Sequence, residues 1–203
     1  MVGTQSDGAA RGPGRPREER VTGAVLRAVV DMVHEQGIAA VTMDAVAARA
    51  GVSKPAIYRR WPTKQDLIIA AAETRIGILS VPDLGDFRSE LRFVLTARLE
   101  AYRLPGTDRL IAGLIGAAAE TGAVRGQYAE YTERITSETR RILERGISRG
   151  DVSPDIDVRA AATLVAAPLI FRLIGEQEMP DVRFVDTLVD LVTRSVSPVG
   201  PVD

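Results

Sequence analysis

The chain contains no cysteine and a single histidine, and these absences exclude several kinds of chemical site. Without cysteine it can form neither disulfide bonds nor thiolate metal sites. His34 alone cannot make the histidine cluster that a catalytic metal needs. The sequence also lacks a thiol nucleophile and a glycine-rich phosphate loop followed by Lys and Ser or Thr. We therefore expect no enzymatic activity, no metal and no cofactor.

Long hydrophobic runs are missing as well. No uninterrupted apolar run approaches the roughly 20 residues with which a helix crosses a bilayer. The N-terminus lacks the apolar core of a signal peptide. Apolar residues nevertheless make up 45% of the 203 residues, which is too many for a disordered chain. We expect a globular cytoplasmic protein without a membrane segment, and the lack of cysteine is compatible with that compartment.

Lysine is scarce, since Lys54 and Lys64 are its only occurrences and arginine supplies the other positive charges. The formal net charge is −1, but the charges are unevenly distributed. Residues 1–75 contain 11 Lys and Arg against 8 Asp and Glu, whereas residues 76–203 contain 15 against 19. The first part therefore carries the positive excess that DNA binding needs. Because this excess is modest, binding should be sensitive to salt and rely on well-placed contacts.

Residues 42–64 predict two short helices joined by a tight turn. Val46 contributes to an apolar face on the first helix, and Gly51 stands where that helix stops, a position that commonly needs a left-handed backbone. Ser53 is a good N-cap for the second helix, and Pro55 is tolerated in its first turn. A second helix held steeply against the first is the usual way to place side chains in a DNA major groove.

The outer face of the second helix is basic. Ile57 falls on the buried side of this helix. This leaves the other residues largely outside, namely Lys54, Ala56, Tyr58, Arg59 and Arg60. A helix of barely two turns with such an outer face is poorly suited to being part of a core. The alternative explanation is an ordinary helical hairpin whose basic face is solvated.

The flanks of the hairpin favour DNA binding. Residues 12–17 form a basic arm rich in Pro and Gly that is not expected to be helical, and that would place Arg15 and Arg17 in the adjacent minor groove. On the other side, Thr63 with an acidic residue three positions later is the N-cap signature of a new helix. Lys64 in the first turn of that helix suits a phosphate.

Residues from about 14 to 73 resemble the N-terminal domain of the TetR family of bacterial transcriptional regulators. The resemblance implies an all-α protein of about nine helices, with an N-terminal three-helix helix-turn-helix DNA-binding domain and a larger helical ligand-binding and dimerisation domain. The chain departs from the family where Arg59 and Arg60 replace the commoner pair of ring residues. The motifs that carry the resemblance are the Gly-Arg-Pro-Arg arm, Gly37, Val41-Thr42-Met43, Ala50-Gly51-Val52-Ser53, Ile57-Tyr58-Arg59-Arg60-Trp61 and Lys64.

Hydrophobic residues recur with the helical period through almost the whole chain, and no segment alternates convincingly as a β-strand would. We expect residues 1–17 to be a flexible basic arm, residues 18–63 the DNA-binding domain, and residues 64–203 the regulatory domain, whose connecting helix begins at residue 64. Besides the helical pair within 42–64, the expected helices are 18–35, 64–79, 86–103, 107–120, 124–149, 156–174 and 181–196.

In the TetR family, the helices that follow the DNA-binding domain enclose a small-molecule pocket, and the ligand displaces the connecting helix. The resemblance therefore implies an effector, which the sequence does not identify. Arg98 and Glu120 are polar candidates for orienting it, with solvated helix faces as the alternative. The large residues that are candidates for the pocket wall, each equally explained as plain core, are Phe93, Tyr102, Leu114, Tyr128, Tyr131 and Phe171.

Two helices near the C-terminus have more apolar surface than one core covers. Residues 160–171 are apolar nearly all round, and residues 181–196 carry two apolar rows. A second copy of the chain would cover the extra face, and a central helix in a monomeric bundle is the alternative. The segment 168–172 also resembles the dimerisation helix of one TetR branch. The predicted dimer residues are Leu164, Pro168, Phe171, Leu188 and Leu191.

The sequence thus predicts a repressor that binds a palindromic operator in double-stranded DNA as a homodimer and that a small molecule releases. Two alternatives stay open, namely a transcriptional activator of the same fold and a helical protein-interaction module without ligand control. Lys54, Ala56 and Arg59 are expected to approach bases, Thr42, Ser53, Tyr58 and Lys64 to hold phosphates, and Arg60 to join this surface.

Overall fold

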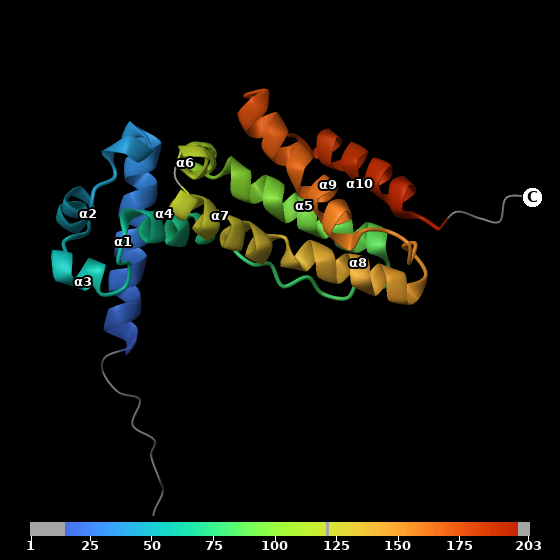
Figure 1. Cartoon of the computed structure of the whole chain (residues 1–203), viewed down its shortest axis with the longest axis horizontal. Helices are drawn as coiled ribbons and strands as arrows, with labels where there is room; N and C mark the ends of the chain where they lie inside the picture. The colour runs from blue at the N-terminus through green and yellow to red at the C-terminus, as the bar shows by residue number, and fades with distance from the viewer. Residues whose placement is uncertain (1–14, 121, 199–203) are drawn as a thin grey trace, which may run out of the picture.

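The computed structural model of the chain describes residues 15–120 and 122–198 (Figure 1). Every regular element within these ranges is helical, which confirms the all-α fold. The elements are α1 (Arg15–Gln36), η1 (Ile38–Ala40), α2 (Met43–Ala50), α3 (Lys54–Tyr58), α4 (Lys64–Glu73), α5 (Phe87–Arg103), α6 (Thr107–Glu120), α7 (Gly122–Ile135), α8 (Ser137–Arg149), α9 (Val158–Ile170), η2 (Phe171–Gly175) and α10 (Val182–Val196).

Figure 1 shows an elongated molecule with α1 to α4 at one end and α5 and α8 to α10 at the other, while α6 and α7 lie between them. The predicted helix 107–120 has the same bounds in the structure, and the predicted helices 86–103 and 181–196 differ only in that their first residues are N-caps.

The first helix begins earlier than the sequence predicts. Residues 15–17 were expected to belong to a non-helical arm, but α1 starts at Arg15. Pro16 explains the difference, because proline fits the first turn of a helix, where a backbone N–H has no partner within the helix. The remainder of the predicted arm, residues 1–14, lies outside the described residues, as do the side chains of Arg15 and Arg17.

The turn between α2 and α3 has the predicted geometry. Gly51 adopts the left-handed conformation with φ 66°, and the N–H of Val52 donates to the carbonyl of Ala47 over 3.0 Å. Ser53 is the extended N-cap residue of α3, and Ile57 on α3 is fully buried. These features hold α3 across α2 and turn its other side outward.

The helix predicted from Lys64 to Leu79 ends six residues early, at Glu73. The hydroxyl of Thr74 donates to the carbonyl of Ala71 over 2.6 Å, and its N–H donates to the same carbonyl. These bonds to a residue three positions back tighten the last turn and stop the helix. Residues 77–86, called the strap below, then run extended along α7 and α8 to the start of α5 (Figure 1).

Two other predicted helices are interrupted. The helix 124–149 is divided at Thr136, whose hydroxyl donates to the carbonyl of Thr132, while the neighbouring carbonyl of Ile135 accepts from Arg98. The helix 156–174 ends at Ile170 and continues as the π-helical turn η2. Pro168 has no N–H for the carbonyl one turn earlier, so it weakens the α-helical pattern at this place.

The buried apolar side chains of the described residues form two clusters, and the first joins α1 to α4 to the rest of the chain. It contains side chains of α1 to α4 together with Leu110 and Leu114 of α6 and Tyr131 of α7. The second lies among α5, α8, α9 and α10. The connecting helix α4, which the predicted domains assign to the regulatory part from residue 64, therefore packs within the same cluster as α1 to α3.

Within the described ranges, one segment reaches the length and mean hydropathy of a membrane-spanning helix, namely Val158–Gly175 with a mean of 1.6. Arg159 and Arg172 interrupt it, and Val165 and Leu169 pack in the second cluster. A core helix of a soluble protein passes the same test, so this single segment is weak evidence for a membrane.

Gly106 lies in the turn before α6 and packs closely against α1. Its φ is +81°, and a Cβ built on it would lie 2.9 Å from the Cβ of His34. We expect Gly106→Ala to lower the free energy of unfolding by about 1–3 kcal/mol, since it adds both backbone strain and overpacking. Urea denaturation measures this loss. The control is Gly116→Ala on α6, where a Cβ meets nothing within 4 Å; equal losses in the two variants would contradict the explanation.

Candidate nucleic-acid interface and internal cavity

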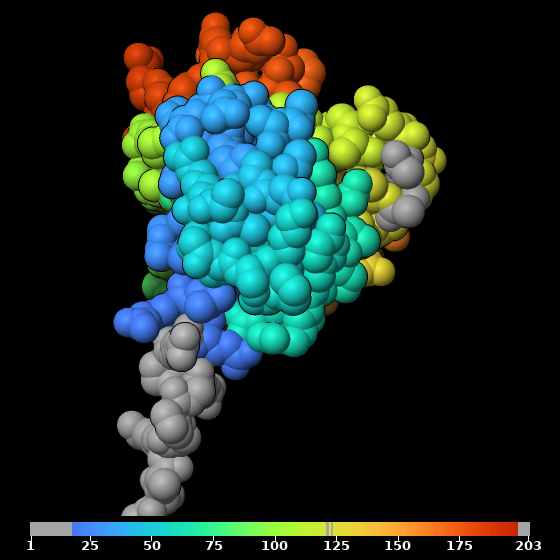
Figure 2. Space-filling view, turned by 90° about the vertical axis from the view of Figure 1, so that its left-hand side faces the viewer, coloured from blue at the N-terminus to red at the C-terminus, as the bar shows by residue number. Residues whose placement is uncertain are grey.

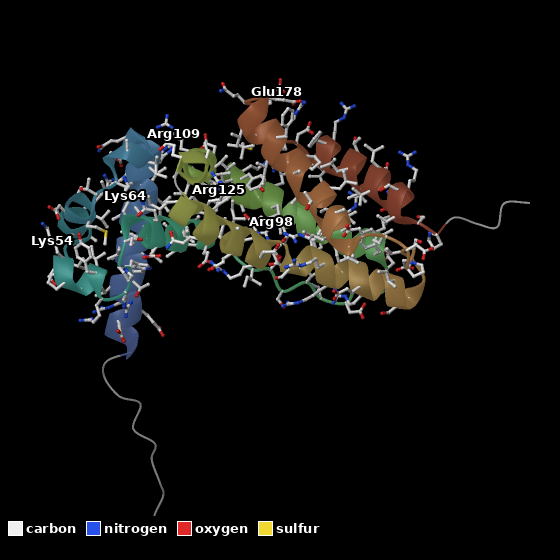
Figure 3. All side chains as sticks on the ribbon, in the orientation of Figure 1. Lys54, Lys64, Arg98, Arg109, Arg125 and Glu178 are labelled. Carbon is white, nitrogen blue, oxygen red and sulfur yellow. The ribbon has the colours of Figure 1, made fainter. Side chains whose placement is uncertain are left out.

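The outer side of α3 forms part of one end of the molecule. Figure 2 looks onto this end, where α1 to α4 cover the surface in blue to teal. Lys54 lies at its outermost part (Figure 3). Tyr58 and Arg59 are exposed on the same short helix, and Ala56 is half-buried. The predicted base-facing and phosphate-facing residues of α3 are therefore together on one accessible surface.

The basic side chains at this end differ in whether they form an ion pair. The ammonium of Lys54 lies 2.5 Å from the carboxylate of Asp44, and both side chains are largely exposed. Arg59, the C-cap residue of α3, is exposed, and its guanidinium has no hydrogen bond or ion pair within the part of the chain that the structure describes. Both groups remain accessible to an incoming phosphate or base, because a surface ion pair is weak in water.

Arg60, in contrast, points back toward α1. Its guanidinium lies 2.6 Å from the carboxylate of Glu18 and donates to the Glu18 carbonyl over 3.2 Å. The hydrogen bond from Arg60 is the main reason that the pKa of Glu18 lies below its usual range. The sequence interpretation placed Arg60 on the outer face, and the structure corrects it: the helix has ended by this residue, so the side chain ties the end of α3 to α1.

The predicted phosphate-holding hydroxyls lie at helix starts. Thr42 is exposed and accepts from the N–H of Ala45 over 3.1 Å as the N-cap of α2. Ser53 is exposed, and its hydroxyl makes no capping bond with α3. Thr42 thus lies at the start of α2, whereas Ser53 lies in the turn directly before Lys54.

The start of α4 has the predicted capping geometry. Asp66 accepts from the N–H and the hydroxyl of Thr63 over 2.9 and 2.7 Å, and the N–H of Asp66 donates to Thr63 Oγ1 over 3.1 Å. Gln127 of α7 also donates to Asp66, over 2.6 Å. Since Asp66 brings a negative charge to this helix end, the half-buried Lys64 is the group there that favours a phosphate.

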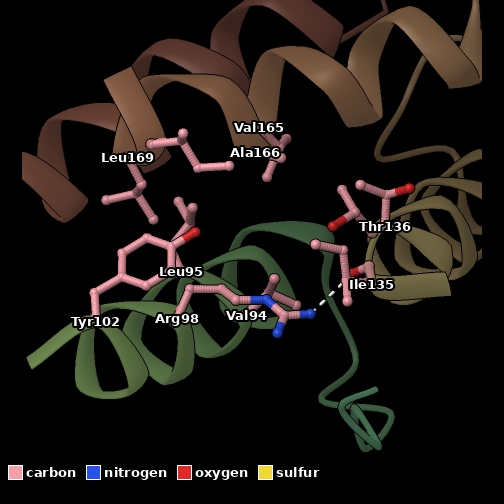
Figure 4. Close-up of a pocket in the computed structure, with 11 residues that line it drawn as sticks. Val94, Leu95, Arg98, Tyr102, Ile135, Thr136, Val165, Ala166 and Leu169 are labelled. Carbon is pink, nitrogen blue, oxygen red and sulfur yellow. Dashed lines mark hydrogen bonds between the residues drawn. The ribbon is translucent and has the colours of Figure 1, made fainter. Parts of the chain in front are cut away.

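A small cavity lies between α5, the junction of α7 and α8, and α9 (Figure 4). Its volume is about 20 Å³, which is room for roughly one water molecule. The polar groups in its wall belong to Arg98, Tyr102, Thr136 and Thr139. The apolar residues of the wall are Val94, Leu95, Ile135, Val165, Ala166, Leu169 and Ile170.

Of the six predicted pocket residues, Tyr102 alone lines this cavity. Leu114 and Tyr131 are buried in the first apolar cluster, and Tyr128 packs beside Tyr131 with ring centroids 6.2 Å apart. Phe171 is 64% exposed.

Phe93, the remaining predicted pocket residue, is 39% exposed. Phe93 and Phe171 are corrections to the sequence interpretation, because the helix periods turn both rings to the surface. A sequence signal for the observed wall exists at Arg98, a charged residue that follows Leu91 and Leu95 on the inward row of α5.

Arg98 is 8% exposed and joins three parts of the chain. Its guanidinium donates to the carbonyl of Gly77 in the strap over 2.9 Å and to the carbonyl of Ile135 over 2.8 Å. It also pairs with the buried carboxylate of Glu138 over 3.4 Å. The other oxygen of Glu138 accepts from the N–H of Leu79, so the wall of the cavity is bonded directly to the strap.

A second buried carboxylate holds the far end of the strap. Glu90 is fully buried, accepts from the N–H of Leu84 over 3.2 Å, and pairs with Arg145 and Arg149 over 3.1 Å each. Arg145 also donates to the carbonyl of Val81 over 3.3 Å. The strap is thus bonded at both ends, and its Gly77 end lies a few residues beyond the end of α4.

Further bonds link α6 and α7 to the DNA-binding helices. Arg109 donates to the carbonyl of His34 at the end of α1 over 2.6 Å. Arg134 of α7 pairs with Glu73 at the end of α4 over 2.5 Å. Together with the shared apolar cluster, these bonds position α1 and α4 relative to α6 and α7.

The predicted dimer residues are only partly on the surface. Leu164 on α9, Phe171 on η2 and Leu191 on α10 are exposed, and Pro168 is half-buried. Leu188 is 8% exposed and lies in the second apolar cluster, which corrects its prediction as an interface residue. The period of α10 places Leu188 on the same inward row as Val185, Val189 and Val192.

Comparisons with known proteins match the N-terminal helices and the remaining helices to two domains of one protein family. Residues 25–71 match the family model described as bacterial regulatory proteins of the tetR family, and residues 81–192 match the tetracyclin repressor-like C-terminal domain. The chain is 31% identical over 165 residues to YdeS of Bacillus subtilis, which is described as an HTH-type transcriptional regulator. The aligned region covers 79% of this chain and 82% of YdeS.

Solved structures share the fold. The TetR family regulator SCO0332 superposes with a TM-score of 0.67 at 28% identity, over 88% of this chain and all of that chain (100%). FadR from Bacillus subtilis, solved in complex with stearoyl-CoA, superposes with a TM-score of 0.64 at 18% identity, over 86% of this chain and 98% of FadR.

Substitution of Glu138 tests whether its buried carboxylate holds the strap in place. We expect Glu138→Ala to lower the free energy of unfolding by about 3–5 kcal/mol, because it leaves a buried guanidinium without its counter-charge. It should also abolish hydrogen-exchange protection of the Leu79 N–H, which mass spectrometry of peptides from residues 77–86 measures. The control is Glu133→Ala, which removes an exposed partner of Arg140 and should cost less than about 1 kcal/mol. Retained protection at Leu79 would contradict this role.

Proposed function

The chain belongs to the TetR family of bacterial regulatory proteins, and on this premise we propose that it is a repressor that binds a palindromic operator as a homodimer and is released by a small molecule. Membership alone makes it a helix-turn-helix transcriptional regulator and not an enzyme. The observation that carries the proposal is the accessible outer side of α3, with Lys54, Tyr58 and Arg59 at the end of the molecule.

The proposed DNA contacts divide by chemistry. Arg59 is an unpaired guanidinium on α3, and such a group pairs with guanine through two hydrogen bonds. Lys54 and Ala56 lie on the same helix and approach neighbouring bases. The hydroxyls of Thr42, Ser53 and Tyr58 hold phosphates, together with Lys64 at the start of α4. Arg15 and Arg17 enter the minor groove beside the recognition helix.

The homodimer rests on the exposed apolar residues of α9, η2 and α10. Leu164, Phe171 and Leu191 present large hydrophobic side chains that this chain's own core does not cover. A second copy buries them by two-fold symmetry, and that symmetry presents two copies of α3 to one duplex. An operator with two-fold symmetry then matches the protein, with its half-sites separated by one or more turns of DNA.

Release by a ligand follows from the connection between the cavity and α4. The guanidinium of Arg98 is in the cavity wall and also holds Gly77, a few residues beyond the end of α4. A ligand that favours a different position of this wall favours a different position of α4, and hence of the two recognition helices. FadR, which has this fold, binds stearoyl-CoA in its crystal structure, so the fold accommodates a ligand. We place the protein in the cytoplasm, where its DNA is.

Base and phosphate contacts are distinguishable by mutation. We expect Arg59→Ala to weaken operator binding by about 1–3 kcal/mol and to relax the preference at one base pair, because it removes a base contact. Lys64→Ala should weaken binding to all duplexes alike and lower the slope of log affinity against log salt by about one. The measurement is fluorescence anisotropy with an operator selected from a random pool.

Arg141→Ala is the control for both variants, since Arg141 is exposed on α8 at the other end of the molecule. It should change neither affinity nor preference. The assignment of roles is wrong if Lys64→Ala alters the sequence preference at unchanged overall affinity. The proposed function itself is wrong if the wild-type chain binds no duplex at any ionic strength.

The proposed interface also has a direct test. We expect Leu191→Glu to convert the dimer to a monomer at micromolar concentration, because the symmetry buries two uncompensated carboxylates in one interface. Sedimentation equilibrium measures the mass. Ile78→Glu makes the same kind of change at an exposed residue of the strap and should leave the dimer intact. A monomeric wild type would exclude the homodimer.

A further inference from the structure

The hydroxyl of Tyr102 faces the cavity and has no hydrogen-bond partner among the described residues. The side chain is 4% exposed and lines the cavity, and Figure 4 shows its hydroxyl directed into the space between α5 and α9. No hydrogen bond to this hydroxyl exists within residues 15–120 and 122–198. The cavity has room for roughly one water molecule beside this hydroxyl, so the hydroxyl can exchange that water for an acceptor group of a ligand.

The phenol of Tyr102 is already protonated at neutral pH with its ordinary pKa of 10, and burial extends the protonated range upward. Burial raises the pKa of Tyr102 to about 12, so the folded state favours the neutral phenol. The stability gained from that preference is complete below the ordinary pKa of 10 and is lost as the pH rises toward 12. At neutral pH the phenol therefore offers its proton to any acceptor in the cavity.

The charge of the cavity wall is already balanced. Among the residues that the structure describes, Arg98 is the only charged one that lines the cavity, and Glu138 lies 3.4 Å from its guanidinium. The remaining wall is aliphatic apart from the hydroxyls of Thr136 and Thr139. A carboxylate or ammonium ligand would be desolvated with no spare opposite charge, whereas an uncharged molecule avoids that cost.

Because the cavity is small, a ligand can occupy it only if the surrounding side chains move. A volume of about 20 Å³ holds roughly one water molecule, so a larger ligand must push its walls apart. Those walls include Arg98, whose bonds to Gly77 and Ile135 fix the strap to the α7–α8 junction. A ligand that enters beside Tyr102 therefore loosens the attachment of the strap.

We propose that this cavity is the effector site and that its ligand is an uncharged, mainly apolar molecule with one carbonyl group, which accepts the hydrogen bond of Tyr102. The aliphatic wall contributed by Val94, Val165 and Leu169 contacts the apolar part of the ligand. This inference rests on the proposed ligand-controlled repressor and specifies the chemistry of its effector. It assigns Tyr102 to ligand recognition and Arg98 to the transmission of binding to α4.

The experiment uses the full chain and small probes that differ at one group. Acetophenone and 2-octanone carry the carbonyl. In α-methylstyrene a methylene replaces the carbonyl oxygen of acetophenone, while benzoate and benzylamine carry a charge. Thermal-shift titration and calorimetry should show binding of at least one ketone, weaker binding of α-methylstyrene, and no binding of benzoate or benzylamine. Ketone binding should also lower the affinity for the selected operator.

Tyr102→Phe is the decisive variant, because it removes only a hydroxyl without a partner and should fold normally. We expect it to weaken ketone binding roughly three- to tenfold, as expected for one hydrogen bond, and to leave α-methylstyrene binding unchanged. Tyr128→Phe removes a hydroxyl outside the cavity wall and should change neither affinity.

Three results would overturn the inference: no binding of either ketone, binding of benzoate or benzylamine as tight as that of the ketones, or unchanged ketone affinity in Tyr102→Phe. The operator titration without probes separates this inference from the proposed function. If the wild-type chain binds the operator but fails one of these criteria, only the effector chemistry is wrong. If it binds no duplex, the repressor proposal fails, whatever the ketones do.

Discussion

The buried guanidinium of Arg98 is the constraint on which the regulatory half of this protein depends. A charge removed from water must be paired and hydrogen-bonded, and the partners of Arg98 come from the strap, the end of α7 and α8. Gly77, Ile135 and Glu138 are therefore held in place together. One side chain of α5 thereby holds the strap just beyond α4, the last carbonyl of α7, and one wall of the cavity.

The two ends of the molecule handle charge in opposite ways. In the regulatory part, carboxylates such as Glu90 and Glu138 are buried and matched to arginines, which fixes the backbone around them. At the DNA-binding end, Lys54 and Arg59 are exposed and can exchange water or a weak ion pair for a phosphate or a base. Between the two ends, α4 and α6 contribute to one apolar cluster, so the two ends are packed together through a shared core.

Local chemistry explains which parts of the structure were predictable. Gly51 has the left-handed backbone that its place after a short helix suggests, and Thr63 forms its capping bonds with a residue three positions away. Such signals involve groups close in sequence, so one sequence contains them completely. Phe93, Phe171 and Leu188 were misplaced for the opposite reason. Whether a large apolar residue faces a cavity, the core or solvent depends on which distant helices cover it.

The sequence by itself determined the helical class, the helix-turn-helix pair with its basic outer face, and the membership in a family of regulators, because these depend on periodicity and on short ordered motifs. Only the tertiary structure decided that α4 stops at Glu73, that Arg60 turns back to α1, and that Tyr102 and Arg98 meet at one cavity. The physical reason is that a buried polar group finds its partners across space, on helices that the sequence leaves dozens of residues apart.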